Sequence, residues 1–167
     1  QSDGTFAGTT LVKNIASGGY GSNPNFLTNV NGTLFFQAFG GTNGAELWQS
    51  DGTEAGTTLV KDIRSGDGSS PNDLTNVNGT LFFTANDGIN GYELWQSDGT
   101  SAGTTLVKDI NSGGHSFPSS LTNVNGTLFF RANDGTNGSE LWQSDGTSAG
   151  TTLVKDIRSG GSSNPRY

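Results

Sequence analysis

The sequence predicts an all-β protein: a β-propeller-like array of three four-stranded antiparallel blades of about 47 residues, with one extra leading strand. Two sequence motifs recur with this period. The motif ELWQSDGT starts at Glu46, Glu93 and Glu140, and the motif LTNVNGTLFF starts at Leu27, Leu74 and Leu121. Propeller blades repeat roughly every 40 to 50 residues and hold four strands each. Glycine contributes 27 of the 167 residues and helps to break up the windows in which a helix could form.

In the middle repeat, residues 74–77 and 80–85 are predicted to form the first two strands, joined by Asn78 and Gly79. An Asn-Gly pair between apolar segments favours a type I′ turn, because both central residues of that turn need a positive φ. The same pair stands at the equivalent places of the other repeats, at Asn31 and Gly32 and at Asn125 and Gly126.

The third and fourth strands are predicted over residues 92–97 and 104–110. Pairing Ser97 with Thr104 sets Trp95 opposite Leu106 and also aligns a glutamate with a lysine. Opposite charges that face each other across two strands contribute about 0.2–1 kcal/mol. We therefore interpret three pairs as structural ion pairs: Glu46 with Lys61, Glu93 with Lys108 and Glu140 with Lys155.

The repeat divides the chain into four parts. Residues 1–26 hold a leading strand, over 9–15, and the loop of an incomplete blade; the three blades cover residues 27–73, 74–120 and 121–167. The loop 17–26 carries one residue more than its equivalents, and thirteen strands are predicted in all. Closed propellers typically hold four to eight blades, so we expect this chain to associate with others or to belong to a longer array.

The words ELWxSDGTxxGT and LTNVNGTLFF resemble the ELWxxDGTxxGT repeats, also called hyalin-like, of large secreted or surface proteins of bacteria. The likeness covers nearly the whole chain. It implies a propeller-like array in an extracellular or cell-surface setting and no firm activity. The first repeat departs from the pattern at Phe39 and Gly40, where the others have Asn and Asp.

Asp51, Asp98 and Asp145 follow the third strand of each repeat in Ser-Asp-Gly-Thr loops. These loops resemble the Asp boxes of sialidase propellers in composition and place, although the spacing differs. An Asp in such a turn accepts hydrogen bonds from nearby backbone N–H groups. We predict that all three are structural turn residues.

The loops between the second and third strands are rich in oxygen ligands. Asp87 and Asn90 lie in one, Asp134 and Asn137 in another, and calcium prefers six to eight oxygens. Each loop holds a single carboxylate and lacks the EF-hand spacing, so turn chemistry is the first interpretation and a calcium site the alternative. We expect no other cofactor.

Trp48, Trp95 and Trp142 could stack on sugar rings, as exposed aromatic residues do in lectins. Each lies in the middle of a predicted strand, and blade faces pack on neighbouring blades. Core packing is therefore the first interpretation, and a ligand-binding role the alternative.

We expect no enzymatic activity, because His115 is the only histidine and no nucleophile motif is present. A net charge of −7 argues against nucleic-acid binding, and no apolar run approaches the roughly 20 residues of a membrane span. The leading hypothesis is an extracellular adhesion or matrix module whose repeated loops bind polysaccharide. The alternative is a structural protein that self-associates into rings or filaments through its blade edges.

Overall fold

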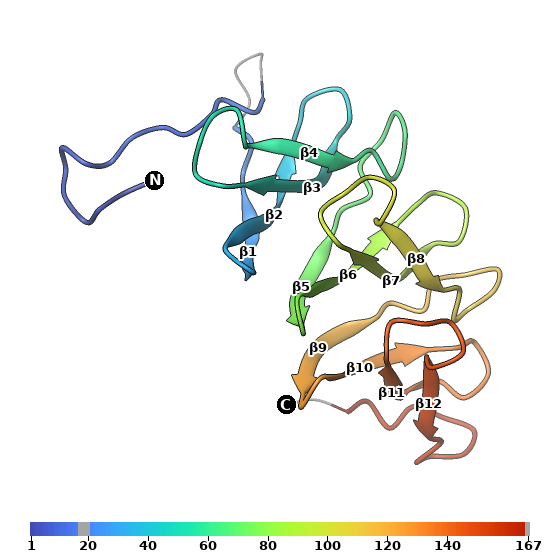
Figure 1. Cartoon of the computed structure of the whole chain (residues 1–167). Coiled ribbons are helices and arrows are strands. Elements are labelled where there is room, and N and C mark those ends of the chain that lie inside the picture. Colours follow the sequence, from blue (N-terminus) through green and yellow to red (C-terminus); the bar gives the residue numbers. More distant parts are fainter. Residues whose placement is uncertain (17–20, 166–167) are drawn as a thin grey trace.

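The computed structural model describes residues 1–16 and 21–165, and within them the chain forms twelve strands and no helix (Figure 1). The strands make three antiparallel four-stranded sheets, each in chain order. Sheet 1 holds β1 Asn25–Val30, β2 Thr33–Phe39, β3 Ala45–Ser50 and β4 Thr58–Lys61. Sheet 2 holds β5 Asn72–Val77, β6 Thr80–Asn86, β7 Tyr92–Ser97 and β8 Thr105–Lys108. Sheet 3 holds β9 Ser119–Val124, β10 Thr127–Asn133, β11 Ser139–Ser144 and β12 Thr152–Lys155. The prediction of an all-β chain with three such sheets is confirmed.

The first hairpin of each sheet turns at the Asn-Gly pair. Val77 pairs with Thr80, which leaves Asn78 and Gly79 as the two loop residues, with φ of 51° and 87°. Both values are positive, as a type I′ turn requires. The pairs Asn31 and Gly32 and Asn125 and Gly126 have φ within two degrees of these.

The register between the third and fourth strands differs from the predicted one because of a β-bulge. Trp95 does pair with Leu106, but the next pair is Leu94 with Lys108, because Val107 is an extra residue on β8. The shift moves Lys108 away from Glu93, so the predicted ion pair is wrong. The same shift separates Glu46 from Lys61 and Glu140 from Lys155. The one ion pair among the described residues joins Arg64 and Asp67 at 2.9 Å.

The predicted leading strand is also wrong. Residues 9–15 belong to no sheet, because none of the described strands pairs with them. Part of the 17–26 loop, residues 17–20, lies outside the described residues. The sheets begin two residues before the predicted boundaries at 27, 74 and 121.

The three sheets pack face against face in chain order. One cluster joins sheets 1 and 2 and includes Phe35, Leu47 and Phe83; the other joins sheets 2 and 3 and includes Phe82 and Phe130. The adjacent phenylalanines of a second strand thus point to opposite faces, as the two-residue period of a strand requires. The first strands β1, β5 and β9 lie beside one another, while the first residues of the chain extend away from the sheets (Figure 1). Within the described residues, no helix has the length and hydrophobicity that crossing a membrane requires.

Candidate functional site

The three tryptophans line the faces on which the sheets meet. Trp95 belongs to the cluster between sheets 1 and 2 and Trp142 to the one between sheets 2 and 3, and each is 6 % exposed. Trp48, on the outer face of sheet 1, is half-buried. The Nε1 atoms of all three are buried and make no hydrogen bond within the described part of the chain. The rings of Trp95 and Trp142 are covered by the preceding sheet and offer a sugar no face, so this geometry favours packing over ligand binding at these two residues.

The Ser-Asp-Gly-Thr loops are closed by their own side chains. Asp98 accepts hydrogen bonds from the N–H of Thr100 at 2.8 Å and from its hydroxyl at 2.7 Å, and the N–H of Gly103 donates to that hydroxyl. These bonds hold the pKa of Asp98 below its ordinary value. Asp51 and Asp145 make the same bonds with their own loop threonines. Each carboxylate thus accepts hydrogen bonds within its own turn.

The loops between second and third strands use their carboxylates in the same way. Asp87 accepts three hydrogen bonds, from the N–H of Ile89 and from the N–H and side-chain amide of Asn90, at 2.7–2.9 Å. Burial raises the pKa of Asp87, but these donors outweigh it and lower the pKa overall. Asp134 is bonded equivalently by Thr136 and Asn137. Donors occupy the oxygens that a calcium ion would need, and no three His, Cys, Asp or Glu residues gather around a metal-sized space in the described ranges.

The glutamates of the ELWQSDGT motifs anchor the loop that follows the fourth strand of each sheet. Glu93 is 0 % exposed and accepts hydrogen bonds from the N–H of Ile110 and from the N–H and hydroxyl of Ser116. Burial raises the pKa of Glu93 above its ordinary value despite these donors. Glu46 is bonded to Ile63, Arg64 and Ser69 in the same way, and burial raises its pKa too.

Glu140 makes the equivalent bonds in sheet 3, with Ile157 and with the N–H and hydroxyl of Ser163. Among the described residues, no further sheet packs over sheet 3. There the hydroxyl of Ser163 and the other donors outweigh burial, and the pKa of Glu140 lies below its ordinary value.

The lysines at the ends of the fourth strands bind the following sheet. The ammonium of Lys61 donates to the carbonyl of Thr104 at 2.7 Å, and that of Lys108 to the carbonyl of Thr151 at 2.8 Å. Lys13 makes the same bond to Thr57 of sheet 1 at 2.8 Å. Residues 9–15 therefore occupy, on sheet 1, the place that β4 occupies on sheet 2. The structure gives Lys155 no such partner among the described residues.

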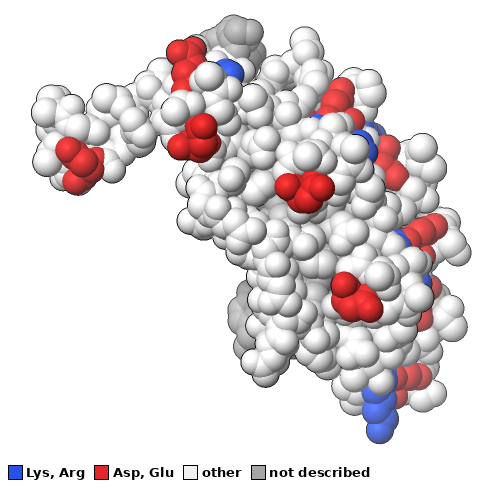
Figure 2. All heavy atoms as spheres, viewed as in Figure 1, with Lys and Arg blue, Asp and Glu red and all other residues white. Residues whose placement is uncertain are grey.

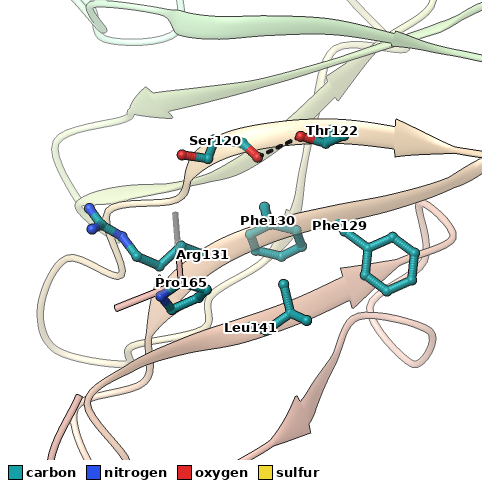
Figure 3. A pocket seen from close by; sticks show the side chains of 7 residues that line it. All are labelled: Ser120, Thr122, Phe129, Phe130, Arg131, Leu141 and Pro165. Carbon is teal, nitrogen blue, oxygen red and sulfur yellow. Dashed lines mark hydrogen bonds between the residues drawn. The ribbon is translucent and has the colours of Figure 1, made fainter. Parts of the chain in front are cut away.

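The outer face of sheet 3 is apolar and uncovered. Val124, Val154 and Ile157 are 46 %, 45 % and 60 % exposed, whereas their equivalents Val77 and Val107 are 6 % exposed. Figure 3 shows Phe129 and Leu141 on neighbouring strands of this sheet, at a hollow bordered by Arg131 and Pro165. The outer face of sheet 1 is covered in part by residues 11–15, and its Leu27 remains 61 % exposed.

An aromatic cluster lies at the end of sheet 2 where the β6–β7 and β8–β9 loops meet. The rings of Tyr92 and Phe117 are stacked, with centroids 5.8 Å apart and planes 22° apart, and the His115 ring lies 4.9 Å from Phe117. The N–H of Tyr92 donates to Nδ1 of His115 at 2.9 Å. Phe117 is 56 % exposed.

This cluster is where sheet 2 departs from the repeat. The positions of Tyr92, His115 and Phe117 hold Ala45, Gly68 and Ser70 in sheet 1, and Ser139, Ser162 and Asn164 in sheet 3. The cluster is not apparent from the sequence alone, because its members are up to 25 residues apart. One feature of the sequence does point to it: three positions that hold small or polar residues in the other repeats hold aromatic residues in the middle repeat.

Phe117 also has a strained backbone, with φ of +47°. The equivalent residues Asn23, Ser70 and Asn164 have φ between +42° and +49°, so the fold imposes this conformation on every sheet. Asn tolerates it, whereas a bulky residue pays about 1–2 kcal/mol. The Phe117 side chain is 56 % exposed, so burial offsets only part of this cost.

Charge is distributed unevenly over the surface. Figure 2 shows acidic side chains spread over the visible face, with most basic side chains along one edge, where acidic side chains also lie. This face therefore offers a polyanion no continuous basic surface.

No model of a known protein family matches the chain, and no curated protein is similar to it.

Proposed function

We propose that this chain is a non-enzymatic, extracellular structural module of the β-propeller type, which assembles head to tail through the outer faces of its first and last sheets. The supporting observation is the chemistry of the face that sheet 3 leaves exposed. Val124, Val154 and Ile157 match the residues that sheets 1 and 2 bury against the sheet that follows. Soluble monomers seldom expose a contiguous apolar face of this kind.

The complementary surface is the outer face of sheet 1. Leu27 lies there, and its equivalents Leu74 and Leu121 pack into the two clusters between sheets. A second copy that placed its sheet 3 on this face would repeat an interface that the chain already makes twice. Its β12 would take the place of residues 9–15, and its Lys155 would donate to the carbonyl of Thr57 in place of Lys13.

Such a contact is heterologous, because it joins two different surfaces. It produces a ring if the rotation closes and a filament if it does not. The side-by-side first strands and the stacking of successive sheets support a propeller-like arrangement of the blades. The resemblance of the ELWxSDGTxxGT words to bacterial surface repeats supports the extracellular setting.

The side chains of the repeated loops favour a structural role over the binding of a partner by these loops. Asp51, Asp87 and Asp98 direct their carboxylates into their own turns, and two of the three tryptophans lie between sheets. None of these side chains is presented to a repetitive partner.

Sedimentation velocity at micromolar concentration tests the proposal. The wild-type chain is expected to sediment as species larger than one chain. The double variant Val154→Lys and Ile157→Lys places two charges on the outer face of sheet 3 and is expected to sediment as a monomer. Both side chains are about half exposed, so the fold should tolerate the change. Wild-type protein that stays monomeric would refute the proposal.

A further inference from the structure

We propose that the cluster of Tyr92, His115 and Phe117 is a binding site for a neutral polysaccharide, and that it binds one sugar ring against the exposed ring of Phe117. The site lies on the loops at one end of sheet 2, and the assembly faces of sheets 1 and 3 are not part of it. It therefore does not depend on the assembly proposed above.

The backbone around the cluster is the same in all three sheets, so the aromatic side chains are not needed to build it. The N–H of Phe117 donates to the carbonyl of Tyr92 at 3.2 Å, and the N–H of Asn164 donates to that of Ser139 at 3.1 Å. The hydroxyl of Ser162 accepts the hydrogen bond that His115 accepts in sheet 2, also at 2.9 Å. Small polar residues thus support the same loop in sheet 3.

Of the three residues in the cluster, Phe117 is the one that its position suits least. Its φ of +47° disfavours a bulky side chain, and its ring is 56 % exposed. Asn, which suits this backbone, stands at the same position in sheet 3. A strained and exposed aromatic residue, stacked on a second ring that holds it in place, indicates selection for a contact outside the chain.

The surroundings of the stack suit a sugar. A hollow of about 470 Å³ adjoins it, within the size range of ligand sites, and is lined by Arg64, Asn86, Ile89, His115 and glycine backbone. Because Nδ1 of His115 accepts from Tyr92, the neutral ring carries its proton on Nε2, which can donate to a ligand. Asn86 uses its side-chain oxygen for the N–H of Gly88, which leaves its amide hydrogens as donors.

This combination, a flat apolar ring beside several hydrogen-bond groups, matches a pyranose, which has C–H groups on its faces and hydroxyls around its edge. The net charge of −7 disfavours an anionic polymer. The ligand class is therefore neutral polysaccharide.

Native affinity electrophoresis in gels containing hydroxyethylcellulose, dextran or galactomannan tests the proposal, with alginate as an anionic control. Wild-type protein is expected to be retarded by at least one neutral polymer and not by alginate. The triple variant Tyr92→Ser, His115→Ser and Phe117→Asn gives sheet 2 the residues of sheet 3. It is expected to lose at least tenfold in affinity and to melt at the same or a higher temperature.

Moving the cluster provides the matched control. Adding Ser139→Tyr, Ser162→His and Asn164→Phe to the triple variant is expected to restore binding on sheet 3. The assembly variant Val154→Lys and Ile157→Lys should bind as the wild type does, which separates this proposal from the assembly. The proposal is overturned if no neutral polymer retards the wild-type chain, if the triple variant binds equally well, or if the triple variant or the single variant Phe117→Asn unfolds. Retardation by alginate alone would equally overturn it.

Discussion

Glu93 accepts two hydrogen bonds from Ser116, one from its backbone N–H at 2.9 Å and one from its hydroxyl at 2.5 Å, across 23 residues of sequence. The bonds join β7 to the loop that leads into sheet 3. Glu46 and Ser69 make the same connection between sheets 1 and 2. The buried carboxylate thus holds the loop that connects each of these sheets to the next one.

Replacing Glu93 by alanine is expected to destabilise the chain by about 3 kcal/mol, because it leaves several buried donors of the 110–116 loop without an acceptor. Urea unfolding measures this loss. The control is Glu140→Ala, since Glu140 anchors a loop that leads to no further sheet among the described residues, and its cost should be smaller. Equal losses at the two positions would argue against the anchoring role.

The stability of the protein should be greatest near about pH 4–5. The pKa values of Glu46 and Glu93 are raised from 4.5, so their contribution is fully present below that pH and is lost as the pH rises through the folded values. The pKa values of the turn aspartates are lowered from 3.8, so their contribution is lost as the pH falls below that value.

Urea midpoints at pH 3, 5 and 7 measure this dependence. The midpoint at pH 5 should exceed both others, and Glu93→Gln should reduce the decline between pH 5 and 7. A midpoint that rises continuously to pH 7 would show that burial does not control the two glutamates.

Trp95→Ala is expected to cost about 3–5 kcal/mol, because the ring is buried between sheets 1 and 2 and its removal leaves a cavity. Trp48→Ala should cost clearly less, since Trp48 lies on an outer face and is half-buried. Denaturation midpoints of the two variants provide the comparison. A Trp95 variant of wild-type stability would contradict the packing role.

Deleting residues 1–16 should strengthen self-association. Lys13 and its neighbours occupy the position on sheet 1 that we assign to β12 and Lys155 of a second copy. Sedimentation velocity of the truncated chain should show larger species at a given concentration, and Lys13→Ala should have a weaker effect in the same direction. Weaker association after truncation would instead show that the segment contributes to the interface.

The parts of the fold that depend on local sequence were predictable. The strand 92–97 is observed with the predicted bounds, and the turn at Asn78 and Gly79 has the expected positive φ, because an Asn-Gly pair between apolar residues encodes that turn by itself. The β-bulge at Val107 was not predictable, since it depends on how two strands pair.

The conformation of residues 9–15 and the formation of the candidate site also depend on tertiary contacts, which the local sequence does not reveal. Residues 9–15 carry the TTLVK sequence of a fourth strand, yet a strand needs a partner to hydrogen-bond with, and none of the described strands pairs with them. Tyr92, His115 and Phe117 come together only because the loops at one end of sheet 2 meet.

Mixing two half-blocked chains tests the head-to-tail assembly most directly. One variant, Val154→Lys with Ile157→Lys, keeps only the sheet 1 face; the other, Leu27→Lys, keeps only the sheet 3 face. Each should be monomeric alone, and an equimolar mixture should form a heterodimer and nothing larger when measured by multi-angle light scattering. A mixture that stays monomeric, or a Leu27→Lys chain that still dimerises with itself, would contradict the account.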